Sequence, residues 1–203
     1  AERRFETLAR PAVDGAPGGG LDPPGVPCCL EGADAAVDPD ARIQEIEMKD
    51  QYADLARDYD WLYPDRQQAG ERQVRSMAPW LDSVTEARVL DCACGTGTLA
   101  VALARHGYDV VGTDASPGMI AQATSHAEGQ ELPLSLSVCT WLDLPQRFGR
   151  EFDFVFCCGN SIGHCRDEAE MVASLTAMRL VLQPGGWLLL DTRDWETLLA
   201  ERT

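Results

Sequence analysis

The sequence predicts an α/β fold with a doubly wound, mostly parallel sheet of the Rossmann-like type. Three observations indicate this class. Short apolar runs alternate with helical patterns from residue 88 onward, a glycine-rich loop follows the first run, and an acid ends the second run. Apolar strands that alternate with helices form parallel sheets that are covered on both faces.

The individual elements follow from the spacing of the apolar residues. Strands are expected near 88–92, 109–114, 134–139, 152–157 and 187–191, and helices near 98–106, 117–127 and 168–182. Two helices should precede the first strand, one over 51–63 that Pro64 ends and one over 68–81. The segment Gln183-Pro184-Gly185-Gly186 predicts a helix stop and a turn before the last strand.

The start of the chain differs in composition from the rest. A chain of 203 residues can form one domain with a substantial core. Residues 10–41 are rich in Pro, Gly, Ala and Asp, which bury too little apolar surface to offset the loss of chain entropy. We therefore expect a disordered tail or linker over residues 1–42 and one folded domain over residues 43–203.

Charge and hydropathy restrict the partners. The net charge of −16 argues against a nucleic acid or an anionic membrane as partner, because phosphate binding depends on Lys and Arg. No apolar run is long enough to span a membrane, and the first residues lack the pattern of a secretory signal. These features predict a cytoplasmic protein whose acidic surface suits either a saline cytoplasm or simply an arginine-biased composition.

The eight cysteines do not form a metal-binding pattern. No C-x-x-C pair occurs, and Cys92, Cys139 and Cys157 lie in apolar, strand-like runs. Free cysteine in such a run behaves as a small buried hydrophobe. We expect neither a metal site nor structural disulfides.

The stretch Asp91-Cys92-Ala93-Cys94-Gly95-Thr96-Gly97 is the main indication of function. An acid ends a buried strand, and two glycines then let the backbone pass close to a ligand before a helix begins. Asp114 ends the next strand, where its carboxylate can accept hydrogen bonds from two vicinal ribose hydroxyls. Together these features predict an adenosine-containing cofactor.

Three details favour S-adenosylmethionine over a dinucleotide, although G-x-G-x-x-A loops occur in both classes. The carboxylate of Asp91 would repel a pyrophosphate but suits a cationic methionyl group. Only two glycines are present, so close approach is needed over a short span. Thr140-Trp141-Leu142-Asp143 follows the third strand, at the place where an adenine ring would lie. A dinucleotide-dependent oxidoreductase or a non-catalytic nucleotide-binding module is the alternative from another class.

Over residues 50–200 the chain resembles the class I S-adenosylmethionine-dependent methyltransferases. Within that class it is similar to glycine N-methyltransferase and to the bacterial glycine/sarcosine N-methyltransferases. The resemblance is carried by Asp50-Gln-Tyr-Ala-Asp54, Val89–Gly97, Val111–Ser116, Trp141-Leu142, Phe152-Asp153, Gly159-Asn-Ser-Ile-Gly-His164, Pro184-Gly-Gly186 and Leu190-Asp-Thr-Arg-Asp-Trp195. The glycine loop is common to the whole superfamily, whereas the motifs at 159–164 and 190–195 are typical of a much smaller group of enzymes within it.

The resemblance implies a cofactor site built from many short segments. Asp114 would hold the ribose, and His164 would lie near the donor. An arginine of the family binds the methionyl carboxylate, and spacing leaves Arg72 and Arg75 open for that role. The other implied cofactor residues are Tyr52, Trp61, Asp91, Ala93, Gly95, Gly97, Thr140, Trp141, Leu142 and Cys158.

The resemblance also implies an amino-acid acceptor. The Gly159 carbonyl and the Asn160 side chain would orient the lone pair of the acceptor nitrogen without a strong base. Arg193, just past the fifth strand, would fix the substrate carboxylate through two parallel hydrogen bonds, with Tyr63 nearby. The residues alone leave other readings open: Arg193 pairing with Asp191 or Asp194, a capping or core role for His164, and core packing for Trp61 and Trp141.

The predicted function is therefore methyl transfer from S-adenosylmethionine to glycine, sarcosine or a related small amino acid. Such a reaction would fit a role in glycine betaine synthesis. A class I methyltransferase with another small-molecule acceptor is the alternative. Enzymes of the family continue past the fifth strand with a closing antiparallel strand pair, so the resemblance implies a C-terminally incomplete domain that lacks its last two strands. The sequence leaves the oligomeric state open.

Overall fold

The computed structural model of the chain describes residues 55–194 and Ala200. All of these residues belong to one of the two compact units of the chain. The predicted tail over residues 1–42, and Tyr52 of the predicted cofactor site, lie outside the described residues.

Five parallel strands form one sheet in the order β3-β2-β1-β4-β5. Their bounds are Arg88–Asp91 (β1), Asp109–Asp114 (β2), Leu134–Val138 (β3), Phe152–Cys157 (β4) and Leu182–Leu190 (β5). The chain returns from β3, at one edge, to β4 beside β1, so the strand order reverses between β1 and β4. Ligands of open parallel sheets bind at the carboxyl ends of the strands at such a reversal. The predicted α/β fold class is confirmed.

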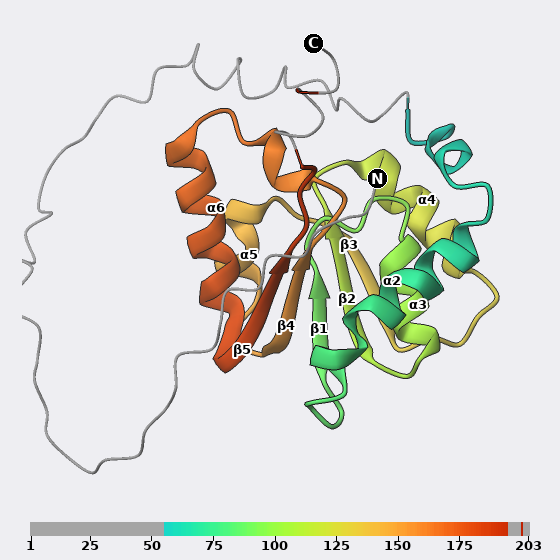
Figure 1. Cartoon of the computed structure of the whole chain (residues 1–203), viewed down its shortest axis with the longest axis horizontal. Coiled ribbons are helices and arrows are strands. Elements are labelled where there is room, and N and C mark those ends of the chain that lie inside the picture. The colour runs from blue at the N-terminus through green and yellow to red at the C-terminus, as the bar shows by residue number, and fades with distance from the viewer. Residues whose placement is uncertain (1–54, 195–199, 201–203) are drawn as a thin grey trace, which may run out of the picture. The chain divides into compact units, whose positions relative to one another are not determined.

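The helices cover both faces of the sheet, as Figure 1 shows. They are α2 (Arg66–Leu81), α3 (Thr98–Arg105), α4 (Pro117–Ala127), α5 (Leu144–Arg147) and α6 (Glu168–Val181), with 3-10 helices η1 (Tyr59–Leu62), η2 (Trp141–Asp143) and η3 (Ser161–His164). Asp65, Ser116 and Asp167 begin α2, α4 and α6, because each side chain accepts a hydrogen bond from a backbone amide of the first turn. Within the described part, no helix has the length and apolarity that crossing a membrane requires.

The core consists of two apolar clusters on opposite faces of the sheet. One contains Val89 and Phe154 together with side chains of α2 and α3. The other contains Leu90 and Val155 together with side chains of α5 and α6. Adjacent residues of a strand point to opposite faces, and strands that are covered on both sides are therefore apolar at successive positions.

Helix α2 lies very close to α3 at Gly70. A Cβ atom at Gly70 would lie 2.5 Å from the Thr98 carbonyl oxygen and 2.8 Å from the Ala102 Cβ. Neither distance is possible without a shift of one helix. Glycine at this position therefore sets how α2 meets the first turn of α3.

The predicted helix over 51–63 is wrong in its described part. Residues 55–58 form a turn, and Tyr59–Leu62 forms the short 3-10 helix η1. Trp61 is 86% exposed and Leu62 is 64% exposed, so this segment does not bury a continuous apolar face among the described residues. Short helices are marginal in water when tertiary packing does not support one face.

The predicted turn over Gln183–Gly186 is also wrong, because these residues belong to β5. Strand β5 pairs with β4 at Phe152↔Leu182 and again from Phe154↔Trp187 onward, and the register shifts between these two pairs. That irregularity accommodates the glycines, and the exposed Pro184 is tolerated because β5 has its described neighbour on one side only.

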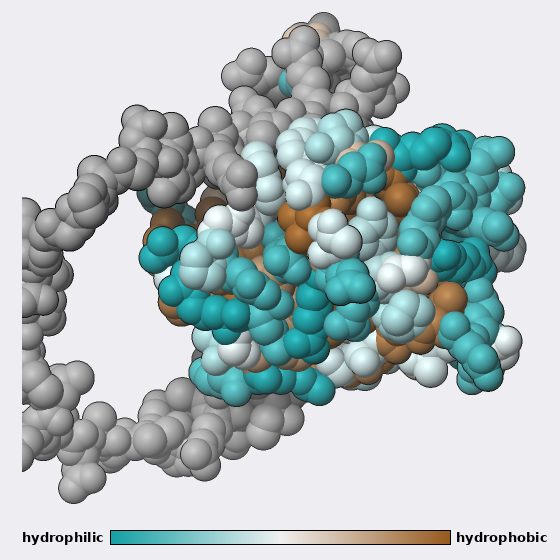
Figure 2. Space-filling model, turned by 90° about the horizontal axis from the view of Figure 1, so that it is seen from below, coloured by the Kyte–Doolittle hydropathy of each residue, from teal (hydrophilic) through white to brown (hydrophobic). Residues whose placement is uncertain are grey.

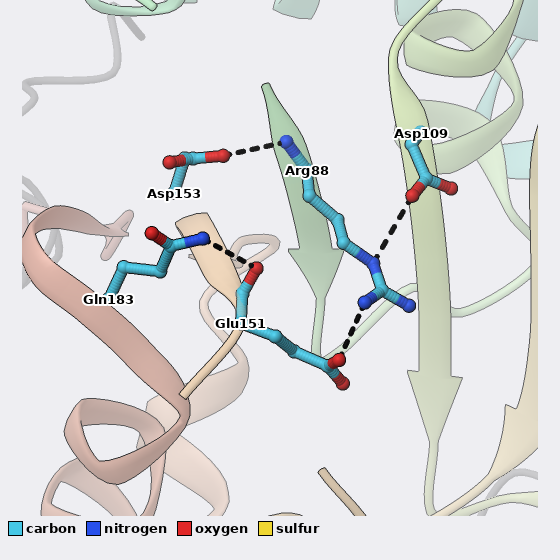
Figure 3. Close-up of polar contacts among 5 residues, drawn as sticks. All are labelled: Arg88, Asp109, Glu151, Asp153 and Gln183. Carbon is cyan, nitrogen blue, oxygen red and sulfur yellow. Dashed lines mark hydrogen bonds and ion pairs between the residues drawn. The ribbon is translucent and has the colours of Figure 1, made fainter. Parts of the chain in front are cut away.

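Opposite charges pair at the amino ends of the strands, around Arg88 (Figure 3). Its guanidinium contacts Glu151 at 2.6 Å and Asp109 at 3.2 Å, and lies over the Phe152 ring at 5.3 Å from its centroid. Its backbone N–H donates to Asp153 Oδ2 at 2.9 Å. Seen from below, the surface of the described part is mainly hydrophilic, with smaller hydrophobic areas between the polar ones (Figure 2).

Candidate functional site

The glycine loop lies between β1 and α3, at the carboxyl end of the sheet. Gly95 and Gly97 both have positive φ, at 52° and 82°, a conformation that side chains other than glycine rarely adopt. The Gly97 N–H donates to the Cys94 carbonyl at 2.9 Å, which closes the bend directly before α3 begins. A Cβ at Gly95 would meet no described atom within 4 Å, so the loop backbone at this point borders open space.

Asp114, at the end of β2, is bonded to this loop. Its Oδ2 accepts from the Gly95 N–H and its Oδ1 from the Ser116 N–H, both at 2.9 Å. These two bonds fix the carboxylate beside the loop. The structure thus places Asp114, the residue predicted to bind the ribose, beside the predicted glycine loop.

Asp91 is a buried carboxyl group at the end of β1. It is 2% exposed, and its Oδ1 accepts from the Ala93 N–H at a long 3.5 Å. Burial, together with the nearby charges of Asp114 and Asp191, raises the pKa of Asp91 from 3.8 to about 7, although the hydrogen bond from the Ala93 amide lowers it. A cation placed here would oppose that rise and favour the ionised form.

Trp141 connects the end of β3 to the end of β1. Its indole Nε1–H donates to the Cys92 carbonyl at 2.8 Å, and its half-buried ring packs against the apolar cluster beneath. Thr140 and Leu142 beside it are exposed, and the Thr140 hydroxyl donates to Asp143 Oδ2 at 2.6 Å. Of the three residues predicted to contact the adenine, Trp141 is thus held in place by a hydrogen bond, and the other two lie on either side of it along the chain.

The residues predicted for the acceptor meet where β4 and β5 end. Asn160 follows β4 in the left-handed conformation, with φ 65°, and its N–H donates to Asp191 Oδ1 at 2.8 Å. Asn160 Oδ1 in turn accepts from the Arg193 N–H at 3.1 Å. Residues more than 30 positions apart are thus joined by two hydrogen bonds.

Residues 89–186, which include the glycine loop and the carboxyl ends of β1 to β4, match the family model of a methyltransferase domain. This segment is a methyltransferase domain.

Curated relatives of the methyltransferase domain differ in the acceptors that their names state. A glycine/sarcosine N-methyltransferase of Parasynechococcus marenigrum (strain WH8102) is 39% identical over 111 residues, which are 55% of this chain and 39% of that enzyme. A ubiquinone biosynthesis O-methyltransferase of Coxiella burnetii is 35% identical over 104 residues, which are 51% of this chain and 42% of that enzyme. The chain spans about two fifths of the length of these curated relatives.

Solved structures resemble the methyltransferase domain in fold. A protein of Pyrococcus horikoshii OT3 has a TM-score of 0.59 and 28% identity, over 71% of this chain and 70% of that chain. An amino pentose methyltransferase of Micromonospora echinaspora, solved with S-adenosylmethionine bound, has a TM-score of 0.54 and 25% identity, over 66% of this chain and 54% of that chain. Together with the family match, these findings confirm the predicted resemblance, the Rossmann-like fold and S-adenosylmethionine as the cofactor.

Four predicted site residues of the described part lie before the segment that matches the family model. Trp61 is almost fully exposed, and the Tyr63 ring lies beside that of Tyr59, with 6.3 Å between centroids. Arg72 donates to Gln68 on its own helix, and Arg75 is exposed on the same helix. The structure does not select either arginine for a methionyl carboxylate, so both assignments stay predictions.

The remaining two predicted cofactor residues lie beyond β4. Cys158 is buried, and its carbonyl accepts from the Ser161 hydroxyl at 2.7 Å, which shapes the turn that contains Asn160. His164 ends η3 and is exposed. A core role for this histidine, one of the readings that the sequence left open, is therefore wrong.

Sequence reasoning missed three side chains that support the site. Asp191 entered only as a surface partner of Arg193, yet it is 4% exposed and bonds the Asn160 amide. Ser116 begins α4 beside Asp114, and the His126 ring lies 2.8 Å from the Thr96 carbonyl of the glycine loop. An acid at the end of an apolar strand was the available signal for Asp191, as it was for Asp91 and Asp114.

The cysteines of the described segment support the core. Cys92, Cys139 and Cys157 are buried, as the sequence predicted, and burial raises the pKa of the Cys92 thiol. Across residues 55–194, His, Cys, Asp and Glu side chains form no group arranged to hold a metal ion.

Proposed function

We propose that this protein transfers a methyl group from S-adenosylmethionine to the amine of glycine, sarcosine or a related small amino acid. The observation that carries the proposal is the pair of hydrogen bonds that joins Asn160 to Asp191 and to Arg193 at the carboxyl end of the sheet. An amide and a guanidinium residue are the groups that an amino acid needs, since one orients its amine and the other its carboxylate. The likeness to a glycine/sarcosine N-methyltransferase supports the same acceptor.

The residues around the glycine loop fit the donor. The open space beside Gly95 leaves room for a ligand against the backbone. The Asp114 carboxylate, fixed by two amides, is the acceptor for the ribose hydroxyls, and the Trp141 ring is the surface for the adenine. Asp91 faces the cationic methionyl group, whose charge would favour the ionised carboxylate.

The donor supplies a methyl group on a positively charged sulfur, which leaves with the electron pair of the broken sulfur–carbon bond. The amine lone pair forms the new nitrogen–carbon bond, so the amine must lose a proton before or during transfer. Asn160 and the Gly159 carbonyl align the nitrogen, and Arg193 holds the carboxylate at the other end. Alignment of two bound reactants accounts for most of the catalysis that such a site provides.

A methyl-transfer assay tests this proposal. The full chain would be incubated with methyl-labelled donor and with glycine, sarcosine or dimethylglycine. We expect label on at least glycine or sarcosine, at a rate that saturates with the acceptor. Labelling confined to unrelated acceptors would contradict the amino-acid assignment while leaving methyl transfer intact.

A second acceptor class has one observation in its favour, the relative named as a ubiquinone biosynthesis O-methyltransferase. In that case Asn160 and Arg193 would serve a phenol or another carboxylate. The same assay with phenolic acceptors separates the two. Thermal shift with S-adenosylhomocysteine against NAD tests the oxidoreductase alternative, because a ligand of the native state raises the melting temperature.

A role in glycine betaine synthesis, a cytoplasmic location, and the absence of nucleic-acid and membrane partners stay predictions from the sequence.

A further inference from the structure

Asp191 is a buried carboxylate that the proposed chemistry does not itself use. It follows β5 directly and is 4% exposed, although aspartate is almost never buried unless it is paired. Its Oδ1 accepts from the Asn160 N–H at 2.8 Å, and its own N–H donates to the Cys157 carbonyl at 3.4 Å. The carboxylate therefore connects the two loops that carry the proposed acceptor residues.

The Asn160 backbone needs such support. Asn160 and the preceding Gly159 both have positive φ, at 65° and 84°. Asparagine adopts this conformation more readily than most residues, but it remains uncommon and is kept when the surroundings fix it. The amide N–H that donates to Asp191 belongs to this same residue, Asn160.

The same contact extends to Arg193. Asn160 Oδ1 accepts from the Arg193 N–H at 3.1 Å, so the direction of the Asn160 side chain and the start of the segment after β5 depend on each other. A displacement of the Asn160 backbone would therefore shift the groups proposed to hold both ends of a bound amino acid.

We infer that Asp191 is a positioning residue for the methyl acceptor: it holds Asn160 and, through Asn160, Arg193. This inference rests on the proposed function. It assigns Asp191 no contact with the acceptor and no proton transfer. It predicts an effect on acceptor binding and a much smaller one on donor binding.

The test compares Asp191→Ala and Asp191→Asn with a matched control, Asp153→Ala. The Asp153 carboxylate likewise accepts from a backbone amide, that of Arg88 at 2.9 Å, but at the opposite end of the sheet (Figure 3). Asp191→Ala should raise KM for the acceptor about tenfold or more, because a hydrogen bond to a charged group is lost. Asp191→Asn keeps one acceptor oxygen and should restore most of the affinity. Affinity for S-adenosylhomocysteine should stay within about threefold in all variants.

Hydrogen exchange of the Asn160 amide, followed in the full chain, gives a readout that does not depend on the acceptor. Exchange at Asn160 should be about tenfold faster in Asp191→Ala, intermediate in Asp191→Asn and unchanged in Asp153→Ala. If the Ala variant does not fold, the Asn variant alone must show faster exchange at Asn160.

Each outcome decides one question. Unchanged exchange at Asn160 in the Asp191 variants, or an equal rise of the acceptor KM in Asp153→Ala, would overturn the positioning role. Faster exchange in a chain that methylates none of the glycine series would support the contact and refute the proposed acceptor.

Discussion

The two ends of the sheet differ in whether their acids are paired with a cation. At the amino end, Asp109 and Glu151 pair with the guanidinium of Arg88, so their charges are compensated close to solvent (Figure 3). At the carboxyl end, Asp114 and Asp191 accept hydrogen bonds from backbone amides, and Asp91 is buried with a raised pKa. The amino end thus pairs opposite charges, whereas the carboxyl end gathers three acids around the proposed donor and acceptor sites.

The largest effect is expected for Arg193→Ala at the carboxyl end. Loss of a bidentate bond to the acceptor carboxylate should lower kcat/KM for glycine by about 1000-fold, since truncating one partner of such a pair costs 2–5 kcal/mol. Donor affinity should stay within about twofold. Labelled-methyl transfer and calorimetry measure the two quantities, and retained turnover would remove Arg193 from the substrate site.

Asp91→Asn tests whether ionisation of this buried carboxyl group at the carboxyl end destabilises the fold. An acid whose pKa is raised on folding, here from 3.8 to about 7, stabilises the fold at low pH relative to high pH. The unfolded chain ionises first, so stability falls between about pH 4 and pH 7 and is lowest above pH 7. The Asn variant avoids this loss and should be more stable at pH 8, by at most about 4 kcal/mol for three pKa units.

Urea unfolding of the wild type and of Asp91→Asn at pH 4.5 and pH 8 measures this difference. The advantage of the variant should be small at the lower pH and largest at the higher pH, while its affinity for S-adenosylmethionine falls. An advantage that is equal at both pH values would show that the Asp91 charge is not the cause.

Asp114→Ala should weaken donor binding by about 100-fold, because two hydrogen bonds from the ribose to a charged group would be lost. The fold should survive, although the Gly95 and Ser116 amides lose their common acceptor. Asp114→Asn is the control, since it keeps an acceptor oxygen. Titration with S-adenosylhomocysteine measures the effect, and unchanged affinity would exclude Asp114 as the ribose ligand.

The smallest effect is expected at the amino end. Arg88→Met keeps the aliphatic stem near the Phe152 ring and removes the pairs with Asp109 and Glu151. Partly exposed pairs of this kind contribute about 1 kcal/mol, so the variant should lose about that much stability. Donor affinity should not change. A clear change would contradict the view that the amino end of the sheet does not contribute to donor binding.

The sequence predicted the strands well where local pattern and global fold agree. The bounds of β2 and β4 were predicted to the residue, because both strands are buried on two faces and end at a turn. The start of β5 was not predictable from Pro184-Gly185-Gly186, because Leu182 already pairs with Phe152 before these residues and pairing resumes only at Trp187. The helix predicted before Pro64 was wrong for a different reason, because the large apolar side chains of its described part, Leu55, Trp61 and Leu62, are exposed.

The site was predictable where one residue type at a strand end implies one role. Asp114 and the glycine loop lie together as expected. The part that sequence could not supply is the bond between Asn160 and Asp191, because pairing across 31 positions depends on how β4 and β5 end side by side. For the same reason the sequence could not choose between Arg72 and Arg75, whose direction depends on how α2 packs.

The contact at Gly70 has a consequence for genetics. Because α3 begins directly after the glycine loop, a methyl group at position 70 would push on Thr98 and Ala102 and so disturb the loop from behind. We therefore expect a Gly70→Ala allele to lower both thermal stability and donor affinity, although it alters no residue of the proposed donor site.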